Sequence, residues 1–178
     1  MKPPTKLKMK EKLKHYQIFW GLILGVIFLD QLTKYLVQLS LPAHPNQVLA
    51  TVSGWLSFVY VQNTGAAWGV MSGSGYILGA LAIVALVAIY MLRKALQLKR
   101  VPMQIAFGLL AAGIVGNMID RLCLGYVVDF IDCTFGTFRF PAFNIADMGI
   151  SVGVVLYIIY SSIDGIVPQK KEIKAEAR

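Results

Sequence analysis

Residues 143–160 read FNIADMGISVGVVLYIIY, and this stretch decides how the chain is expected to fold. It opens with two polar side chains, Asn144 and Asp147, and then continues as an apolar run. A helix that crosses a bilayer needs about 20 mostly apolar residues. A carboxylate within such a helix is costly unless it is paired or reached by water. The stretch therefore predicts a membrane-spanning helix that carries a compensated acid near one end.

Three further segments are apolar enough to cross a membrane. Of the 178 residues, 57% are hydrophobic, and the mean hydropathy of +0.64 is well above that of an ordinary globular chain. Apolar runs at 18–39, 76–92 and 103–124 join the run at 144–163. A soluble helical bundle would need polar helix faces, and the segment 76–92 has none. We therefore expect an all-α integral membrane protein with four transmembrane helices.

The net charge of +8 comes from three basic clusters on one side of these helices. The clusters are Lys2, Lys6, Lys8, Lys10, Lys12 and Lys14; Arg93, Lys94, Lys99 and Arg100; and Lys170, Lys171, Lys174 and Arg178. Such an excess is typical of cytoplasmic flanks, so both termini are expected in the cytoplasm and nucleic acid is not expected as a partner. The clusters mainly set orientation, and contacts with anionic membrane lipids stay open.

The whole chain, 1–178, is expected to form a single membrane domain. It would comprise a basic cytoplasmic tail at 1–15, extracytoplasmic segments at 40–75 and 125–143, and a cytoplasmic tail at 164–178. The first apolar run is interpreted as a retained anchor, because no small-x-small cleavage site follows it.

The extracytoplasmic segments favour a small β-platform. The stretches WLSFVYVQN (55–63), YVVDFIDC (126–133) and TFGTFRF (134–140) are rich in aromatic and β-branched residues, which are typical of strands. Cys123 and Cys133 both fall on this side of the membrane. A disulfide between them is compatible with an oxidising compartment, and the sequence does not decide it.

Five of the nine acidic residues converge on the outer level of the membrane: Asp30, Asp120, Asp129, Asp132 and Asp147. Ionisable groups at this depth are functional candidates, because each is costly unless it is compensated. Asp30 and Lys34 form an i, i+4 pair with the acid first, which is the better orientation. Asn117, Asp120 and Arg121 share one face of their helix. These groups could equally have a structural role, as polar contacts that hold the helices together.

Asp129 and Asp147 have no obvious basic partner of their own. Two carboxylates placed close together repel, so that one holds a proton while the other stays ionised. Such a pair can activate water and protonate a reacting amide without a metal or cofactor. Zinc and serine hydrolase motifs are absent, and the only histidines are His15 and His44. A small transporter or proton-relay protein using the same acids, or a non-catalytic assembly factor, stays open as an alternative.

Five motifs in order then resemble the bacterial lipoprotein signal peptidase family, also called signal peptidase II. They are DQLTK (30–34), NTGAAWG (63–69), GNMIDR (116–121), VVDF (127–130) and FNIAD (143–147). Ala112 stands where the family more often has Gly, and Trp68 where Phe is commoner. Neither departure touches the acids.

The resemblance implies an aspartic endopeptidase of the cytoplasmic (inner) membrane, without a metal or cofactor. Its substrate would be a diacylglyceryl-modified prolipoprotein, cut on the N-terminal side of the lipid-modified cysteine near the outer leaflet. Asp129 and Asp147 would be the catalytic dyad. The residues that would bind substrate or support the dyad are Asn117, Arg121 and Asn144, with Asp120 supporting Arg121, and in addition Asn63, Gly65, Asp30 and Lys34. We expect the protein to act as a monomer.

Overall fold

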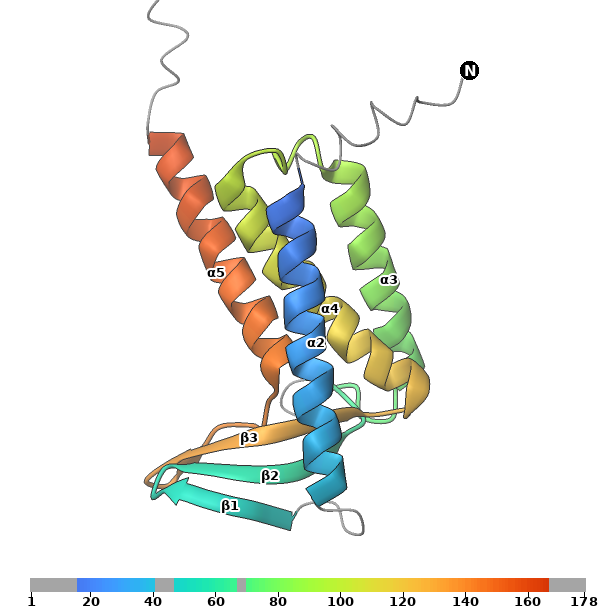
Figure 1. Ribbon diagram of the computed structural model, residues 1–178, viewed down its shortest axis with the longest axis vertical. Coiled ribbons are helices and arrows are strands. Elements are labelled where there is room, and N and C mark those ends of the chain that lie inside the picture. The colour runs from blue at the N-terminus through green and yellow to red at the C-terminus, as the bar shows by residue number, and fades with distance from the viewer. Residues whose placement is uncertain (1–15, 41–46, 67–69, 167–178) are drawn as a thin grey trace, which may run out of the picture.

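Four helices form a bundle, and a small sheet lies across one end of it (Figure 1). The computed structural model describes residues 16–40, 47–66 and 70–166. The helices are α2 (Gln17–Ser40), α3 (Gly75–Leu92), α4 (Val101–Cys123) and α5 (Ile145–Ile166). All four are long and apolar enough to span a membrane, and each begins and ends within three residues of the predicted position. The predicted set of four transmembrane helices is confirmed.

The two ends of the bundle differ in character. The four strands gather at one end, which we call the sheet end. At the opposite end, α2 begins, α5 ends, and a basic connection with Arg93, Lys94, Lys99 and Arg100 joins α3 to α4 (Figure 1). Among the described residues, the buried polar and charged side chains lie at the sheet end, except for Gln104 near the start of α4.

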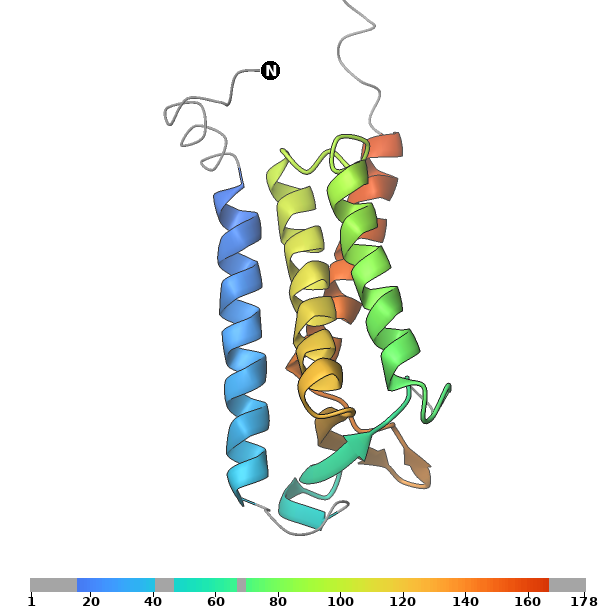
Figure 2. The same cartoon turned by 90° about the vertical axis from the view of Figure 1, so that its right-hand side faces the viewer.

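Helix α4 is the centre of the bundle. It packs against α2, α3 and α5, whereas the main contacts of α3 are with α4 alone (Figure 2). Glycines let α5 approach α4 closely, since a Cβ on Gly153 would lie 2.6 Å from the carbonyl oxygen of Ala106. The outer helix faces carry exposed large apolar side chains such as Leu24, Phe28 and Tyr76, as a lipid environment requires.

The sheet is antiparallel, with strand order β1-β2-β3-β4. Its strands are β1 (Gln47–Ser53), β2 (Leu56–Asn63), β3 (Val127–Phe135) and β4 (Phe138–Arg139). The predicted β-platform is confirmed in β2 and β3, and β1 was not predicted. The stretch TFGTFRF was expected to be one strand, which is wrong. It turns at Gly136, whose φ of 61° suits glycine, and so forms the tip of the β3–β4 hairpin.

A tight turn returns the chain from α4 into β3. Gly125, with a φ of 82°, follows the last turn of α4 and donates its N–H to the carbonyl of Arg121 at 3.2 Å. Glycine at this position ends a helix without a Cβ penalty. Because the turn is short, Asp129 on β3 lies beneath the end of the helix that carries Asn117. Cys123 and Cys133 are both free, so they form no disulfide in this structure.

Candidate active site

The first turn of α5 is fixed by a reciprocal cap. The Oδ1 atom of Asn144 accepts the backbone N–H of Asp147 at 2.9 Å, and the Oδ2 atom of Asp147 accepts the N–H of Asn144 at 3.2 Å. This exchange is the capping-box arrangement, with Asn and Asp in the two roles. The acid that seemed misplaced in an apolar helix therefore satisfies a backbone N–H that α5 would otherwise leave unpaired.

The position of Asp129 is set by the register of β2 against β3. Asn63 lies opposite Val127, so its side chain is a diagonal neighbour of Asp129 on the same sheet face. Its Nδ2 donates to Oδ2 of Asp129 at 2.9 Å, while its Oδ1 accepts the N–H of Gly65 at 2.9 Å. Gly65 is required here, because a Cβ on it would lie 2.7 Å from the carbonyl oxygen of Val70. The turn at Gly65 thus aims the Asn63 amide at the acid.

Asn144 joins the two acids. It is fully buried, and its Nδ2 donates to Oδ1 of Asp129 at 2.7 Å while its backbone N–H is bound to Asp147. Asn117 adds a second donor to Asp147, with Nδ2 2.7 Å from Oδ1. Each carboxylate therefore accepts two neutral N–H donors. Within the described ranges, no basic side chain forms an ion pair with either acid.

Both acids line one cavity of about 830 Å³ at the sheet end of the bundle. Its polar wall includes Asn63, Asn117, Arg121, Asp129 and Asp147. Its apolar wall is formed by side chains from α5 and from the segment that precedes it, including Phe140, Pro141, Phe143, Met148 and Val152. The cavity thus presents two carboxylates beside a surface suited to apolar groups.

Burial makes Asp129 a weaker acid than an ordinary aspartate. Loss of solvation and, after it, the negative charge of Asp147 together raise the pKa of Asp129 to about 7, against the opposing hydrogen bonds from Asn63 and Asn144. A carboxyl with such a pKa can hold or release a proton near neutral pH, as general acid–base chemistry requires.

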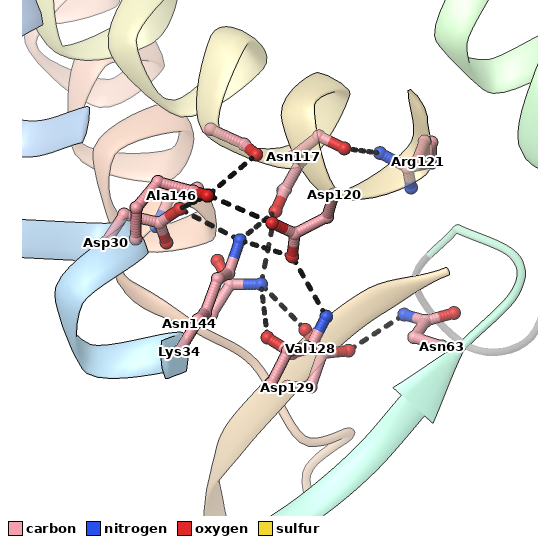
Figure 3. Close-up of polar contacts among 12 residues, drawn as sticks. Asp30, Lys34, Asn63, Asn117, Asp120, Arg121, Val128, Asp129, Asn144 and Ala146 are labelled. Carbon is pink, nitrogen blue, oxygen red and sulfur yellow. Dashed lines mark hydrogen bonds and ion pairs between the residues drawn. The ribbon is translucent and has the colours of Figure 1, made fainter. Parts of the chain in front are cut away.

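A second acid pair lies deeper in the bundle, as Figure 3 shows. Lys34 pairs with Asp30 and with Asp120, each at 2.9 Å, and all three side chains are at most 3% exposed. The predicted Asp30–Lys34 pair is therefore confirmed. Asp120 was expected to support Arg121, and the structure instead directs its carboxylate to Lys34, Gln31 and the N–H of Val128.

Arg121 lies at the cavity wall, held there through two of its five N–H donors. Its Nη1 and Nη2 donate to the carbonyl oxygens of Asn117 at 3.3 Å and Gly65 at 3.0 Å. Its buried Nε has no hydrogen-bond partner in the described part of the chain. Buried N–H groups are normally satisfied, so this donor is available to a molecule in the cavity.

Comparison with known proteins places this chain in a family. A model of signal peptidase (SPase) II matches residues 22–163. A lipoprotein signal peptidase of Staphylococcus aureus (strain JH9) is 36% identical over 164 residues, which cover 90% of this chain and 99% of that protein. One from Listeria monocytogenes serotype 4a (strain HCC23) is 34% identical over 147 residues, covering 82% and 94%.

The chain belongs to the signal peptidase II family. A bacterial membrane enzyme solved by the in meso method at 2.3 Å resolution matches with a TM-score of 0.76 and 33% identity, over 85% of this chain and 92% of that one. A second, solved at 1.9 Å, gives 0.69 and 34% over 80% and 90%. The predicted family and enzyme class are thus confirmed: the protein is an aspartic-type peptidase of a bacterial membrane, and the transporter alternative is not favoured.

All ten predicted site residues of this chain lie at the sheet end, but they divide into two groups. Asn63, Asn117, Arg121, Asp129 and Asp147 line the cavity, with Asn144 buried behind them and Gly65 bound to Asn63 and Arg121. Asp30, Lys34 and Asp120 form the separate buried cluster.

Sequence reasoning missed one member of this network, Gln31. Its Nε2 donates to Asp30, to Asp120 and to the carbonyl of Gly116 at 2.9–3.3 Å. Its place beside Asp30 in DQLTK was the available signal. Among the described residues, no group of three His, Cys, Asp or Glu side chains is placed to hold a metal ion.

Proposed function

We propose that this member of the signal peptidase II family removes signal peptides from diacylglyceryl-modified prolipoproteins, with Asp129 and Asp147 as its catalytic dyad. The observation that carries the proposal is the shared position of the two carboxylates. Both line one cavity, both are bound by Asn144, and neither is neutralised by a described basic side chain. Two such acids are sufficient for hydrolysis of a peptide bond by water.

The surroundings of the acids suggest how they divide the work. Asp129 enters the reaction protonated, because burial raises its pKa to about 7. Asp147 enters as carboxylate and removes a proton from a water molecule that attacks the scissile carbonyl carbon. Asp129 donates its proton to the carbonyl oxygen, which gives a neutral tetrahedral diol. Return of a proton from Asp147 to the amide nitrogen then releases the amine, and Asp129 recovers its proton from the diol.

Neighbouring donors suit the binding of an extended peptide. Arg121 offers its Nε–H toward a substrate carbonyl, and one bond from each of Nη1 and Nη2 holds the guanidinium in place. The apolar wall around Phe140, Met148 and Val152 suits apolar residues of the signal peptide or the lipid chains. Because α3 packs mainly on α4, the substrate helix can lie against α4 between α3 and α5.

The orientation in the membrane follows from the same assignment. The basic end of the bundle faces the cytoplasm with both termini, and the sheet end faces outward. The active site then lies near the outer leaflet of the cytoplasmic membrane, where the lipid-bearing cysteine of the substrate would reside. The chain works as one membrane domain and as a monomer, with outer segments 40–75 and 125–143.

Two amide substitutions test the dyad. Asp129→Asn and Asp147→Asn each remove one acid and keep its size, so each is expected to lower cleavage at least about 1,000-fold, within the usual range for loss of a general acid or base. The measurement is the gel shift of a purified lipid-modified precursor in detergent. Circular dichroism and the melting temperature serve as controls for folding.

Retained cleavage in either folded variant would remove that acid from the mechanism. Asp132→Asn is the matched control, because Asp132 on β3 is bound by Arg139 on β4 and makes no contact with the dyad in the hydrogen bonds described. It should cleave at the normal rate. Liposome flux that depends on Asp129 and Asp147, with no change in any precursor, would instead support the transporter alternative.

A further inference from the structure

Lys34 is saturated by three acceptors in the interior of the protein. Its Nζ lies 2.9 Å from Asp30, 2.9 Å from Asp120 and 3.1 Å from Oδ1 of Asn117. An ammonium group has three donors, so none is left over. The cluster of Asp30, Lys34 and Asp120, which we call the lysine cluster, is therefore closed to solvent and to substrate.

The two acids of the lysine cluster also bind backbone groups next to the dyad. Oδ1 of Asp30 accepts the N–H of Ala146 at 2.9 Å, and Oδ2 of Asp120 accepts the N–H of Val128 at 3.0 Å (Figure 3). Ala146 immediately precedes Asp147, and Val128 immediately precedes Asp129. Each buried acid thus holds the chain one residue before one acid of the proposed dyad.

Lys34 acts on the dyad by a third route, through Asn117. A lysine ammonium only donates and a carboxylate only accepts, so the Asn117 amide must turn its oxygen to Lys34 and its nitrogen to Asp147. The observed contacts agree, with Oδ1 3.1 Å from Nζ and Nδ2 2.7 Å from Oδ1 of Asp147. The charge of Lys34 therefore fixes which end of the amide faces the reaction.

We propose that Asp30, Lys34 and Asp120 are positioning residues, which set the backbone register of Asp129 and Asp147 and the orientation of Asn117. The inference rests on the proposed dyad. Two observations favour a positioning role over simple adhesion between helices. Apolar residues often replace a buried ion cluster without loss of stability, so adhesion does not call for one. The contacts also fall on the two peptide units adjacent to the acids, which belong to different elements, β3 and α5.

Asp120 offers the sharper test, because one of its oxygens meets both Lys34 and the N–H of Val128. Asp120→Ala removes that acceptor and leaves Lys34 paired with Asp30, so no buried charge is left alone. Asp120→Asn removes the same charge but can keep an oxygen at that place. A difference between the two variants therefore reports the acceptor rather than the charge.

We expect kcat for precursor cleavage to fall about 100-fold in Asp120→Ala, as for a misplacement of about 1 Å at a reacting group. KM should change less than about threefold, because an effect confined to the transition state leaves ground-state binding alone. Asp120→Asn should recover most of the lost kcat. Hydrogen exchange at the amide of Val128, read by mass spectrometry in detergent, should be faster in Asp120→Ala than in Asp120→Asn.

Asp30→Ala repeats the test on α5, since it frees the N–H of Ala146 and leaves Lys34 paired with Asp120. The proposal is overturned if folded Asp120→Ala keeps its kcat. It is also overturned if Asp120→Asn is as slow as Asp120→Ala, or if activity in both variants falls only as the folded fraction falls. Asp129→Asn and Asp147→Asn in the same assay separate the failure of the dyad from the failure of the positioning proposal. Retained cleavage in either of these variants refutes the dyad. Loss of cleavage in both, together with a fully active Asp120→Ala, refutes only the positioning role.

Discussion

The protein holds two pairs of aspartates within one hydrogen-bond network, and they have opposite surroundings. Asp30 and Asp120 share the ammonium of Lys34 and are sealed from solvent. Asp129 and Asp147 receive only neutral amide donors and line a cavity. A carboxylate has about four lone-pair sites, so two donors leave each acid of the second pair able to bind water or substrate.

The difference shows what turns an intramembrane acid from support into a reactive group. A buried cation compensates the negative charge of the acids that it contacts. Amide donors position a carboxylate without fixing its charge, so the pKa of Asp129 can rise to about 7 through burial and the nearby charge of Asp147. Asn117 links the two pairs, because its amide binds Lys34 through its oxygen and Asp147 through its nitrogen.

The largest expected effect on stability comes from removing the cation. Lys34→Met leaves Asp30 and Asp120 buried without a counter-ion, so the free energy of unfolding should fall by about 3–5 kcal/mol. Thermal unfolding in detergent measures the loss. The triple variant with Lys34→Met, Asp30→Asn and Asp120→Asn should regain most of it, and a single variant that melts with the wild type would show that the cluster is not held by its charge.

The second prediction concerns the pH dependence of stability that Asp129, in the pair without a cation, should cause. In the folded state the pKa of Asp129 lies near 7, above the unfolded value of 3.8, because of burial and Asp147. Ionisation of Asp129 therefore opposes folding: the contribution of this group to stability is fully present below pH 4 and is lost as the pH rises through 7. The side chain at position 129 cannot ionise in Asp129→Asn. As the pH rises from 4 to 8, the free energy of unfolding of this variant should therefore increase relative to that of the wild type, by at most about 4 kcal/mol.

Melting temperatures of wild type and Asp129→Asn at several pH values measure this gap. The groups that face Asp129 are Asn63, Asn144 and Asp147, with the charges of Lys34 and Arg121 farther off, and none of them is altered by the substitution. Parallel melting curves across the pH range would contradict an elevated pKa at Asp129. Asp132→Asn is the control, and its difference from the wild type should not widen in the same way.

The third prediction tests the space that the lysine cluster occupies. A Cβ on Gly116 would lie 2.7 Å from Oδ2 of Asp30 and 3.1 Å from Cβ of Ala146, so Gly116→Ala should cost about 1–3 kcal/mol. Gly79→Ala in α3 is the matched control, because its Cβ would meet no atom within 4 Å and alanine favours a helix. Denaturation measures both variants. A lower free energy of unfolding for Gly79→Ala than for Gly116→Ala would contradict the close packing around Gly116 in α4.

The smallest effect belongs to an ion pair at the protein surface. Arg139 binds Asp132 through two bonds of 2.9 and 3.0 Å, which raise the pKa of Arg139, but its side chain is 64% exposed. Arg139→Gln should lower stability by less than about 1 kcal/mol, and the effect should shrink in high salt. Melting in low and high salt measures it. A loss of stability in Arg139→Gln as large as that in Lys34→Met would show that solvent exposure does not weaken the Arg139–Asp132 pair relative to the buried pairs of Lys34.

Much of the architecture could be predicted from the sequence, because long apolar runs and basic flanks are local signals. The four helices, two of the strands and the level of the acids followed from them. The missing strand β1 and the hairpin at Gly136 depend on pairing with β2 and β3, which no local pattern encodes. The reciprocal cap of Asn144 and Asp147 was visible as an i, i+3 pair but was not interpreted as a cap.

The sequence by itself determined which residue types meet at the sheet end of the bundle, since hydropathy fixes depth along each helix and depth selects Asp30, Asp120, Asp129 and Asp147. Only the tertiary structure decided how these acids are divided. Lys34 and Asp120 are 86 residues apart in the chain, and so no spacing rule could pair them. The physical reason is that an acid's role depends on whether packing brings it a cation or a cavity, and both arise from segments distant in sequence.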